Sequence, residues 1–192
     1  MSQSLYLDKE RFALALDQSV SVIEDASAFS IGTSISLNKK ADIAIQYSSI
    51  TNRGSENQRS SNADGFSGYL TFWAKKTQEE FPLEVGLSIL GSYADYDDFE
   101  ISSFGIGVIL AYKKEQPTGF EVVPLVGVSF VPFSQVSSNL YSRASNEQFF
   151  SFQFGVGLFT DIFNQSKFVL EPTMTFDTSA NIGASLSTSI IF

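Results

Sequence analysis

Ionisable side chains are where catalysis or metal binding would reside, and this sequence offers mainly carboxylates. Its 192 residues include 21 Asp and Glu, 12 Lys and Arg, and neither His nor Cys. Without Cys there are no disulfides, thiolate ligands or cysteine nucleophiles, and without His there is no Ser-His-Asp triad. Paired carboxylates remain able to perform acid–base work when their environments separate their proton affinities. The net charge of −9 argues against a nucleic-acid partner.

One acidic segment is a candidate for binding a cation. It contains Asp95, Asp97, Asp98 and Glu100. Hard divalent cations prefer several carboxylate oxygens. However, the segment lacks the spacing and the glycine of a calcium loop, which favours a solvated acidic loop instead. The sequence therefore predicts no cofactor and no metal site, with this segment as the only weak candidate.

Apolar residues alternate with small or polar residues along nearly the whole chain. In the final run, Ile182, Leu186 and Ile190 share one face, and serines occupy the other. A period of two indicates β-strands, and no helix-length window holds a period of 3.6. No apolar stretch reaches the 20 or so residues that a membrane helix needs. The pattern predicts one all-β domain over residues 1–192 with ten strands, or eight as the alternative.

The connections between predicted strands differ in charge. Lysine pairs recur in three alternate connections, at Lys39-Lys40, Lys75-Lys76 and Lys113-Lys114. An up-and-down meander places successive connections at opposite ends. We therefore expect a lysine end with short turns and a loop end with longer, more acidic loops. The longest predicted loops, Asn52–Asp64 and Pro132–Gln148, are candidate recognition elements, because loops on a rigid scaffold often carry binding. Candidate anchors in the second are Phe133, Leu140 and Tyr141.

The two faces of the strands indicate a membrane barrel. The less apolar face is mostly Gly, Ala and Ser, and only 17% of all residues are charged. A water-exposed face so poor in charge is unusual, so we place it inside and the apolar face toward lipid. Closing the sheet pairs every strand edge. The sequence predicts a closed, antiparallel, up-and-down transmembrane β-barrel; the alternative is a soluble β-barrel with inverted faces that binds an apolar ligand inside.

Aromatic residues near the strand ends fit girdles at the two membrane interfaces. At the lysine end these are Phe12, Trp73, Phe81, Phe120, Phe168 and Phe192. At the loop end they are Phe29, Tyr47, Phe66, Tyr93, Phe130, Phe149 and Phe176.

The last strand carries a family resemblance. It ends in Phe192, with Ile190 and Leu186 on the same face. This resembles the terminal assembly signal of bacterial outer-membrane β-barrel proteins, such as small OmpA/OmpW-like or porin-like barrels. Ser187 departs from the pattern, which usually has Gly there.

The resemblance implies a location in the outer membrane of a Gram-negative bacterium. It also implies insertion by the barrel-assembly machinery and contact with outer-membrane lipid and lipopolysaccharide. Both termini and the short turns would then face the periplasm, and the long loops would be extracellular.

The face assignment predicts which charged side chains point into the lumen. They are Arg11, Asp17, Asp42, Lys75, Glu84, Lys113, Glu121, Asp161 and Glu171. We expect them to form ion pairs that partly close the barrel near the lysine end.

The function predicted from these features is non-enzymatic. Catalytic barrels of this class, the lipid A deacylases and the omptin proteases, use Ser-His or Asp-His pairs, which this chain cannot form. We therefore expect a binding or anchoring component of the cell envelope, with other envelope proteins as candidate partners. The alternative is a narrow porin for small solutes, because a ten-stranded lumen is narrower than that of 16–18-stranded porins.

Two features of the sequence disturb the pattern. Pro124 and Pro172 lie inside predicted strands, where each removes a ladder donor, so we expect bulges there. Between residues 66 and 75 the alternation slips, because Tyr69 and Trp73 lie opposite to Phe66 and its neighbours. Either a bulge or an incorrect face assignment would explain the slip.

Overall fold

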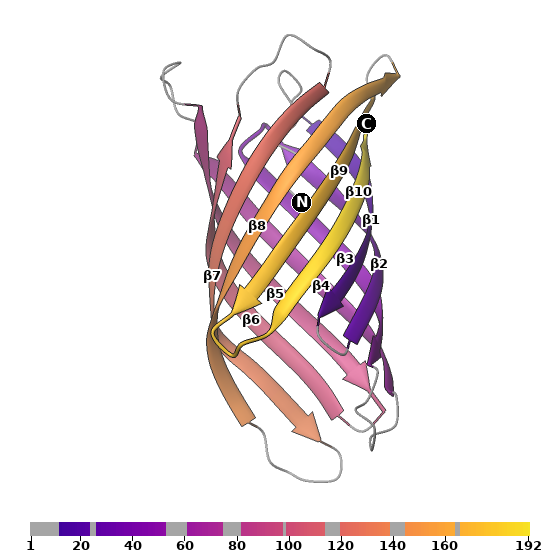
Figure 1. The fold of residues 1–192 in the computed structure, drawn as a ribbon, viewed down its shortest axis with the longest axis vertical. Helices are drawn as coiled ribbons and strands as arrows, with labels where there is room; N and C mark the ends of the chain where they lie inside the picture. Colours follow the sequence, from indigo (N-terminus) through magenta and orange to yellow (C-terminus); the bar gives the residue numbers. More distant parts are fainter. Residues whose placement is uncertain are drawn as a thin grey trace.

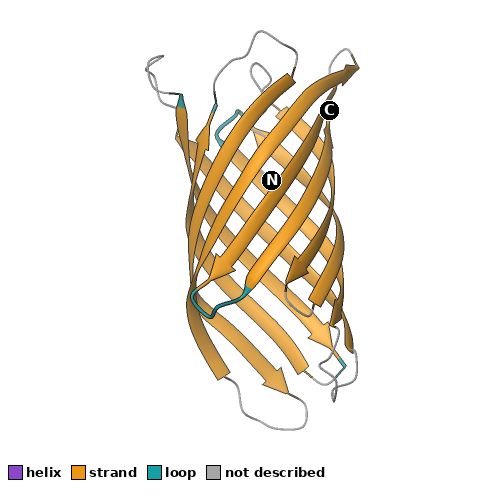
Figure 2. Cartoon of the chain, in the orientation of Figure 1, coloured by secondary structure: helices purple, strands orange, loops and turns teal. Residues whose placement is uncertain are grey.

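The chain forms a closed barrel of ten antiparallel strands (Figure 1). The computed structural model describes residues 12–23, 26–52, 61–74, 82–97, 99–113, 120–138, 145–163 and 166–192. The strands are β1 (Phe12–Ile23), β2 (Ala26–Leu37), β3 (Ala41–Asn52), β4 (Ser61–Ala74), β5 (Leu83–Tyr96), β6 (Phe99–Tyr112), β7 (Phe120–Ser138), β8 (Ser145–Phe163), β9 (Ser166–Asp177) and β10 (Ile182–Ile191). Described residues include no helix long and apolar enough to cross a membrane, and Figure 2 draws strands and turns alone.

Each strand pairs with its sequence neighbours, and β1 pairs with β10 to close the sheet. In this closing seam Asp17 lies opposite Ser189, and Ser21 lies opposite Ser185. The up-and-down order confirms the predicted fold, and the eight-stranded alternative is wrong.

The β2–β3 connection shows how local sequence sets a hairpin. Asn38 and Lys39 have φ angles of 51° and 56°, and the Lys40 N–H donates to the Leu37 carbonyl at 3.0 Å. Positive φ at both central residues is the type I′ turn, whose twist matches that of the flanking strands. Asn tolerates this conformation better than most residues. The first lysine pair therefore lies in a tight turn, as predicted.

The apolar side chains point outward around the barrel. On β1, Phe12 and Leu16 are each 57% exposed, whereas Ala13 and Ala15 are fully buried on the lumen side. The same alternation holds on β10, where Leu186 is exposed. An exposed apolar wall suits hydrocarbon. The soluble alternative, with its faces inverted, is wrong.

Strand β4 is regular where the alternation slips. Its pairing with β3 and β5 has no register shift. Phe66 and Phe72 are exposed on the outer wall, while Trp73 is only 5% exposed inside the lumen. Neither a bulge nor a wrong face is needed, because this strand carries large aromatic residues on both faces. The predicted position of Trp73 in the lysine-end girdle is therefore wrong.

Neither strand proline produces a bulge. Pro124 pairs in register with Val156, and Pro172 with Leu186. Beside Pro172 the β8–β9 ladder passes from the Gly155–Thr173 pair directly to the Leu158–Leu170 pair. The backbone N–H that Pro172 lacks therefore falls where the ladder has no pairs. The register shifts lie elsewhere, at Phe104/Ile106, Val131/Ser134 and Asp161/Phe163.

The prediction that the connections are short at the lysine end and long at the loop end is wrong, because their lengths at the two ends are similar. Connections at the lysine end are residues 38–40, 75–82, 113–119 and 164–165; those at the loop end are 24–25, 53–60, 97–98, 139–144 and 178–181. Strands instead continue into the predicted loops, since β7 runs to Ser138 and β8 starts at Ser145. These two 19-residue strands form a hairpin that projects at the loop end (Figure 1). Leu140 and Tyr141 lie outside the described residues.

Candidate functional site

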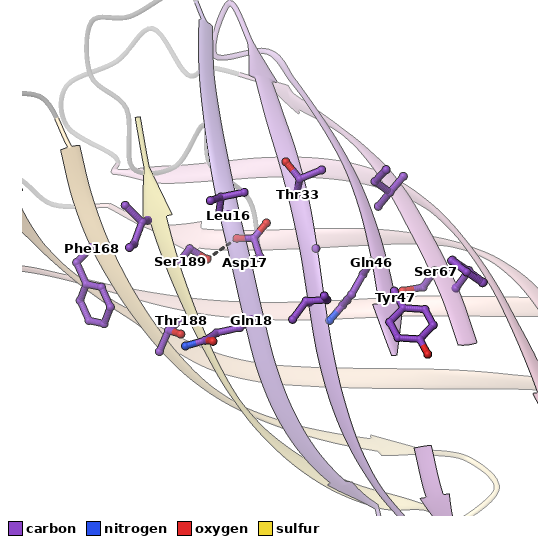
Figure 3. A pocket seen from close by; sticks show the side chains of 15 residues that line it. Leu16, Asp17, Gln18, Thr33, Gln46, Tyr47, Ser67, Phe168, Thr188 and Ser189 are labelled. Atoms are coloured by element: carbon purple, nitrogen blue, oxygen red, sulfur yellow. Dashed lines mark hydrogen bonds between the residues drawn. The ribbon is translucent and has the colours of Figure 1, made fainter. Parts of the chain in front are cut away.

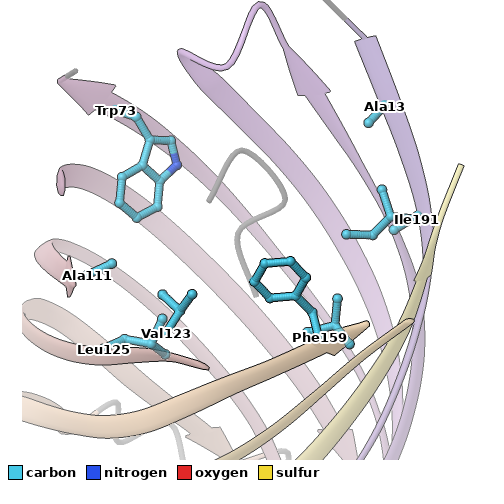
Figure 4. Packing of buried hydrophobic residues seen from close by; sticks show 9 residues of the cluster. Ala13, Trp73, Ala111, Val123, Leu125, Phe159 and Ile191 are labelled. Atoms are coloured by element: carbon cyan, nitrogen blue, oxygen red, sulfur yellow. The ribbon is translucent and has the colours of Figure 1, made fainter. Parts of the chain in front are cut away.

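The lumen is filled with apolar side chains near the lysine end (Figure 4). We call this cluster the lumen plug. Its members are Ala13, Ala15, Trp73, Ala111, Val123, Leu125, Phe159, Val169 and Ile191. They come from seven strands, and β2, β3 and β5 add buried Ser36, Asp42 and Gly86 on the same inward face. Every strand therefore contributes a buried residue to this part of the lumen.

Sequence reasoning missed the plug, although a signal was present. The run Val122-Val123-Pro124-Leu125 is apolar on both faces, and Val123 and Leu125 are 1% and 8% exposed. Strands that are buried on both faces read as continuous apolar runs. Ile191 gives the same signal, since it is an apolar residue on an otherwise serine-rich face and is 1% exposed.

Buried carboxylates lie among the apolar side chains. The Trp73 indole Nε1–H donates to Asp42 Oδ2 at 2.8 Å, and Asp42 is fully buried. Glu171 is 4% exposed on β9. A buried carboxylate needs hydrogen-bond donors, so the indole both packs in the plug and stabilises Asp42.

On the loop-end side of the plug, hydrogen bonds between side chains connect neighbouring strands along the lumen wall. Asp17 accepts a hydrogen bond from Ser34 Oγ of β2 at 2.6 Å and another from Ser189 Oγ of β10. Gln46 Nε2 donates to Ser19 Oγ at 3.0 Å. Asp17 therefore connects three strands at the seam that closes the barrel.

Two recesses, one largely polar and one mixed, occupy the lumen beside these bonds. A recess of about 320 Å³ is lined by serines of β1, β2, β3 and β10, together with Asp17 and Gln46. A second, of about 190 Å³, lies along β4 to β9 and includes Gln153 and Glu171. Tyr69 borders both. The lumen thus combines an apolar plug with hydroxyl-lined space.

The charges predicted for the lumen fall into three groups. Asp17, Asp42, Glu84, Glu121, Asp161 and Glu171 lie on the inward-facing register of their strands. Lys113 is half-buried directly after β6. Arg11 and Lys75 lie outside the described residues. Asp161 is exposed and pairs in register with Lys167.

The acidic candidate for a metal site is a tight strand connection. Asp95 and Glu100 pair directly across β5 and β6, Asp97 lies in the bend between them, and Asp98 is outside the described residues. Within the described ranges, no group of three or more His, Cys, Asp or Glu residues could hold a metal ion.

The residues of the terminal signal lie together on the outer wall. Leu186, Ile190 and Phe192 are 48%, 39% and 55% exposed, and Ser187 faces inward between them. With Thr188 between the first two, they form a mostly apolar stripe along the outward face of β10 and the residue that follows it.

Comparison with known proteins supports the fold. No family model matches the sequence, and no curated protein matches it. Among solved structures, the β domain of the Bordetella autotransporter BrkA aligns with a TM-score of 0.56 at 9% identity, covering 95% of this chain and 99% of that one. The translocator domain of the autotransporter NalP from Neisseria meningitidis gives 0.49 at 11% identity, covering 99% and 91%. LpxR from Salmonella typhimurium gives 0.41 at 9% identity, covering 94% and 99%. Together with the closed ten-stranded sheet and its apolar outer wall, the BrkA alignment shows that the chain has the fold of bacterial outer-membrane β-barrels.

Proposed function

We propose that this chain is a non-enzymatic, non-conducting outer-membrane barrel that serves as a binding or anchoring component of the cell envelope. The lumen plug carries this proposal. Large side chains such as Trp73 and Phe159 fill the lumen from opposite sides of the barrel, and they are 5% and 3% exposed. Moving a hydrated solute past them would require desolvating its polar groups, which is unfavourable.

The projecting β7–β8 hairpin supports the binding role. Each of its strands has 19 residues, and a tilted membrane strand needs about 9–11. The surplus carries the hairpin beyond the rest of the wall, with Phe133 39% exposed on it. A hairpin of paired strands that carries an exposed apolar residue is a suitable recognition element, because already paired strands lose little conformational entropy on binding.

Planar-bilayer recording tests the closed lumen. We expect the wild-type barrel to show no discrete conductance, and Trp73→Ala combined with Phe159→Ala to produce steps. The matched control is Phe72→Ala combined with Phe154→Ala, which truncates two outward-facing phenylalanines. Steps from the wild-type protein would overturn the proposal and favour the narrow porin, for which the serine-lined recess between β1, β2, β3 and β10 supplies polar space.

The binding role needs a separate test. The protein would be purified from native membranes in mild detergent, alongside a variant in which residues 132–148 are replaced by a two-residue turn. We expect envelope proteins to accompany the wild type and to be lost with the shortened hairpin. Equal recovery with both forms would refute recognition by this hairpin.

The same proposal includes orientation and assembly. We place the lysine end and both termini in the periplasm and the β7–β8 hairpin outside the cell, with lipopolysaccharide around the outer wall and insertion by the barrel-assembly machinery. Whole-cell labelling with a membrane-impermeant thiol reagent tests the orientation, since the chain has no native Cys. Phe133→Cys should react in intact cells, and Lys39→Cys only after lysis; the reverse pattern would refute this orientation.

A further inference from the structure

Strand β8 has an unpaired edge at the loop end, where it continues beyond the end of β9 (Figure 1). The β8–β9 ladder reaches only the Ser151–Asp177 pair, whereas β8 starts at Ser145. Residues 145–147 and 149 pair with β7 on their other side. Within the described ranges, no strand pairs with residues 145–149 on the β9 side. We call residues 145–149 the free edge.

The backbone groups of the free edge point toward the β9 side at alternate residues. Phe150 shows the direction, since its N–H donates to Thr178 Oγ1 at 3.1 Å and its carbonyl accepts from the Thr178 N–H at 2.9 Å. The two backbone groups of one residue lie on the same side of a strand, and the side alternates along the chain. Asn146 and Gln148 therefore each present an N–H and a carbonyl to a further strand.

The turn after β9 leaves this edge uncovered. Asp177 accepts hydrogen bonds from the backbone N–H groups of Ser179 and Asn181 at 2.9 and 3.0 Å, and from the Asn181 side-chain amide at 2.8 Å. These bonds fold the turn back on itself, and Figure 1 shows the β7–β8 hairpin projecting beyond it.

Other edges of the sheet are paired or blocked. At the closing seam the β1–β10 ladder reaches the last residue of β1, and the hydrogen bond from Ser189 to Asp17 reinforces it (Figure 3). At the lysine end β7 extends beyond its ladder with β6, which stops at the Ala111–Leu125 pair, but that edge contains Pro124, which has no N–H. The free edge contains neither Pro nor Lys, the residues that commonly prevent edge pairing. It is therefore open to strand addition.

We propose that the free edge binds an extended, basic segment of another protein, which adds a strand antiparallel to β8. Such a segment carries N–H and carbonyl groups at the two-residue spacing that the edge presents. This inference rests on the proposed binding role of the β7–β8 hairpin, and it specifies the class of partner and the mode of contact.

The charge of the loop end selects a basic partner. Glu147 is exposed on the free edge, and Asp95, Asp97 and Glu100 lie at the same end of the barrel. The described residues at this end include no Lys or Arg. Glu147 and the half-buried Phe149 share one face of β8, so a Lys or Arg on the added strand can pair with the carboxylate while its stem covers the ring. The acidic rim also attracts a basic segment from solution.

The same charge disfavours a second copy of this chain. Two free edges that both use Asn146 and Gln148 would pair antiparallel, with the two Glu147 carboxylates opposite each other. Like charges in that position destabilise a strand pair. The two-fold axis of such a pair is perpendicular to the sheet and lies in the membrane plane, whereas copies in one membrane share their orientation.

Fluorescence anisotropy with the purified barrel in mild detergent tests the mode of binding. The probe is a labelled seven-residue peptide of alternating Val and Lys. We expect its affinity to fall about tenfold or more when every backbone nitrogen is methylated, and by a similar factor when Glu replaces Lys. No binding of the Lys peptide would overturn the proposal. Equal affinity of the methylated peptide would overturn backbone pairing, and equal affinity of the Glu peptide would overturn the basic partner.

Two variants locate the binding at the free edge. Gln148→Pro removes an N–H that faces away from β7, a position where proline is tolerated, and should weaken binding about tenfold or more. Glu147→Gln should weaken it about threefold, and more than the control Asp95→Asn on β5, which β6 and β7 separate from β8. Retained gel mobility without boiling would show that the variants fold. Unchanged binding by Gln148→Pro, or equal effects of the two charge changes, would refute this location.

Amide hydrogen exchange measured by NMR tests the edge itself. In the free protein the Gln148 amide should exchange faster than that of Phe150, and the Lys peptide should slow it. A protected Gln148 amide without peptide would show that the edge is already covered and would overturn the proposal. If replacing residues 132–148 abolishes recovery of envelope proteins but Gln148→Pro does not, the binding role of the hairpin stands and strand addition alone is refuted.

Discussion

Removing the Asp17 carboxylate should destabilise the barrel at its closing seam. This side chain accepts hydrogen bonds from Ser34 on β2 and Ser189 on β10, so one carboxylate connects three strands. A hydrogen bond to a charged group contributes about 1.5–3 kcal/mol, so two would contribute about 3–6 kcal/mol at a dry site. The recess of about 320 Å³ beside Asp17 admits water, which can replace part of both bonds. We therefore expect Asp17→Ala to lower the free energy of unfolding by about 2–4 kcal/mol.

Asp17→Asn should have a smaller effect. The amide keeps one carbonyl acceptor for a serine hydroxyl but loses the charge and the second acceptor, so about 1–2 kcal/mol should be lost. The ordering of wild type, Asn and Ala is a stricter test than any single value. A double-mutant cycle of Asp17→Ala with Ser189→Ala isolates the coupling between this pair.

Urea unfolding of the protein in lipid vesicles measures these differences. The chain has one Trp, and Trp73 lies in the lumen plug, so its fluorescence reports on the interior of the folded barrel. The slope with urea should not change if the variants unfold from the same state. The matched control is Ser187→Ala, an inward serine of β10 for which the described chain supplies no hydrogen-bond partner. If Asp17→Ala costs no more than this control, or if Asn and Ala are equally damaging, the account of the seam is wrong.

Two further changes test the plug and the wall. Trp73→Phe removes the indole donor to Asp42 and should lower stability by about 1–3 kcal/mol, measured by thermal melting of the circular dichroism signal in detergent. A small loss would mean that Asp42 does not depend on the indole. Gly32→Ala places a Cβ 2.6 Å from the Ile45 carbonyl oxygen and should cost about 1–3 kcal/mol in the same assay, whereas Gly127→Ala, with no neighbouring atom nearer than 3.5 Å, should be tolerated. Equal effects of the two alanines would refute the close backbone approach at position 32.

The fold was predictable because one physical rule governs most of the chain. A lipid-facing wall forces alternate residues to be apolar, and the opposite face of a narrow barrel accepts small residues. On β10 the serines at 185, 187 and 189 and the apolar Leu186 and Ile190 on the opposite face left little choice of face. Strand number followed from counting such runs.

The plug was harder to predict because alternation does not distinguish two apolar environments. Trp73 on the lumen side and Phe72 on the lipid side are both large and aromatic. Only the register of β4 with its neighbours shows which of the two faces the lumen. The extension of β7 and β8 was missed for a related reason. Beyond the membrane these strands need not be apolar outside, so Ser134 and Gln135 suggest a loop, although they pair with β8.

An apolar outer wall and a largely small and polar inner face explain how a chain with a mean hydropathy of +0.06 can contain 19 Phe residues. Lipid contact alone would favour an apolar outer wall and leave the whole lumen polar. Burial of Val123, Phe159 and Ile191 adds a second apolar region inside, near the lysine end. Closure of the lumen and stability of the barrel therefore depend on the same side chains. Variants that open the plug should lose stability as they gain conductance. A variant that conducts at undiminished stability would show that the plug is a separable gate rather than part of the folded core.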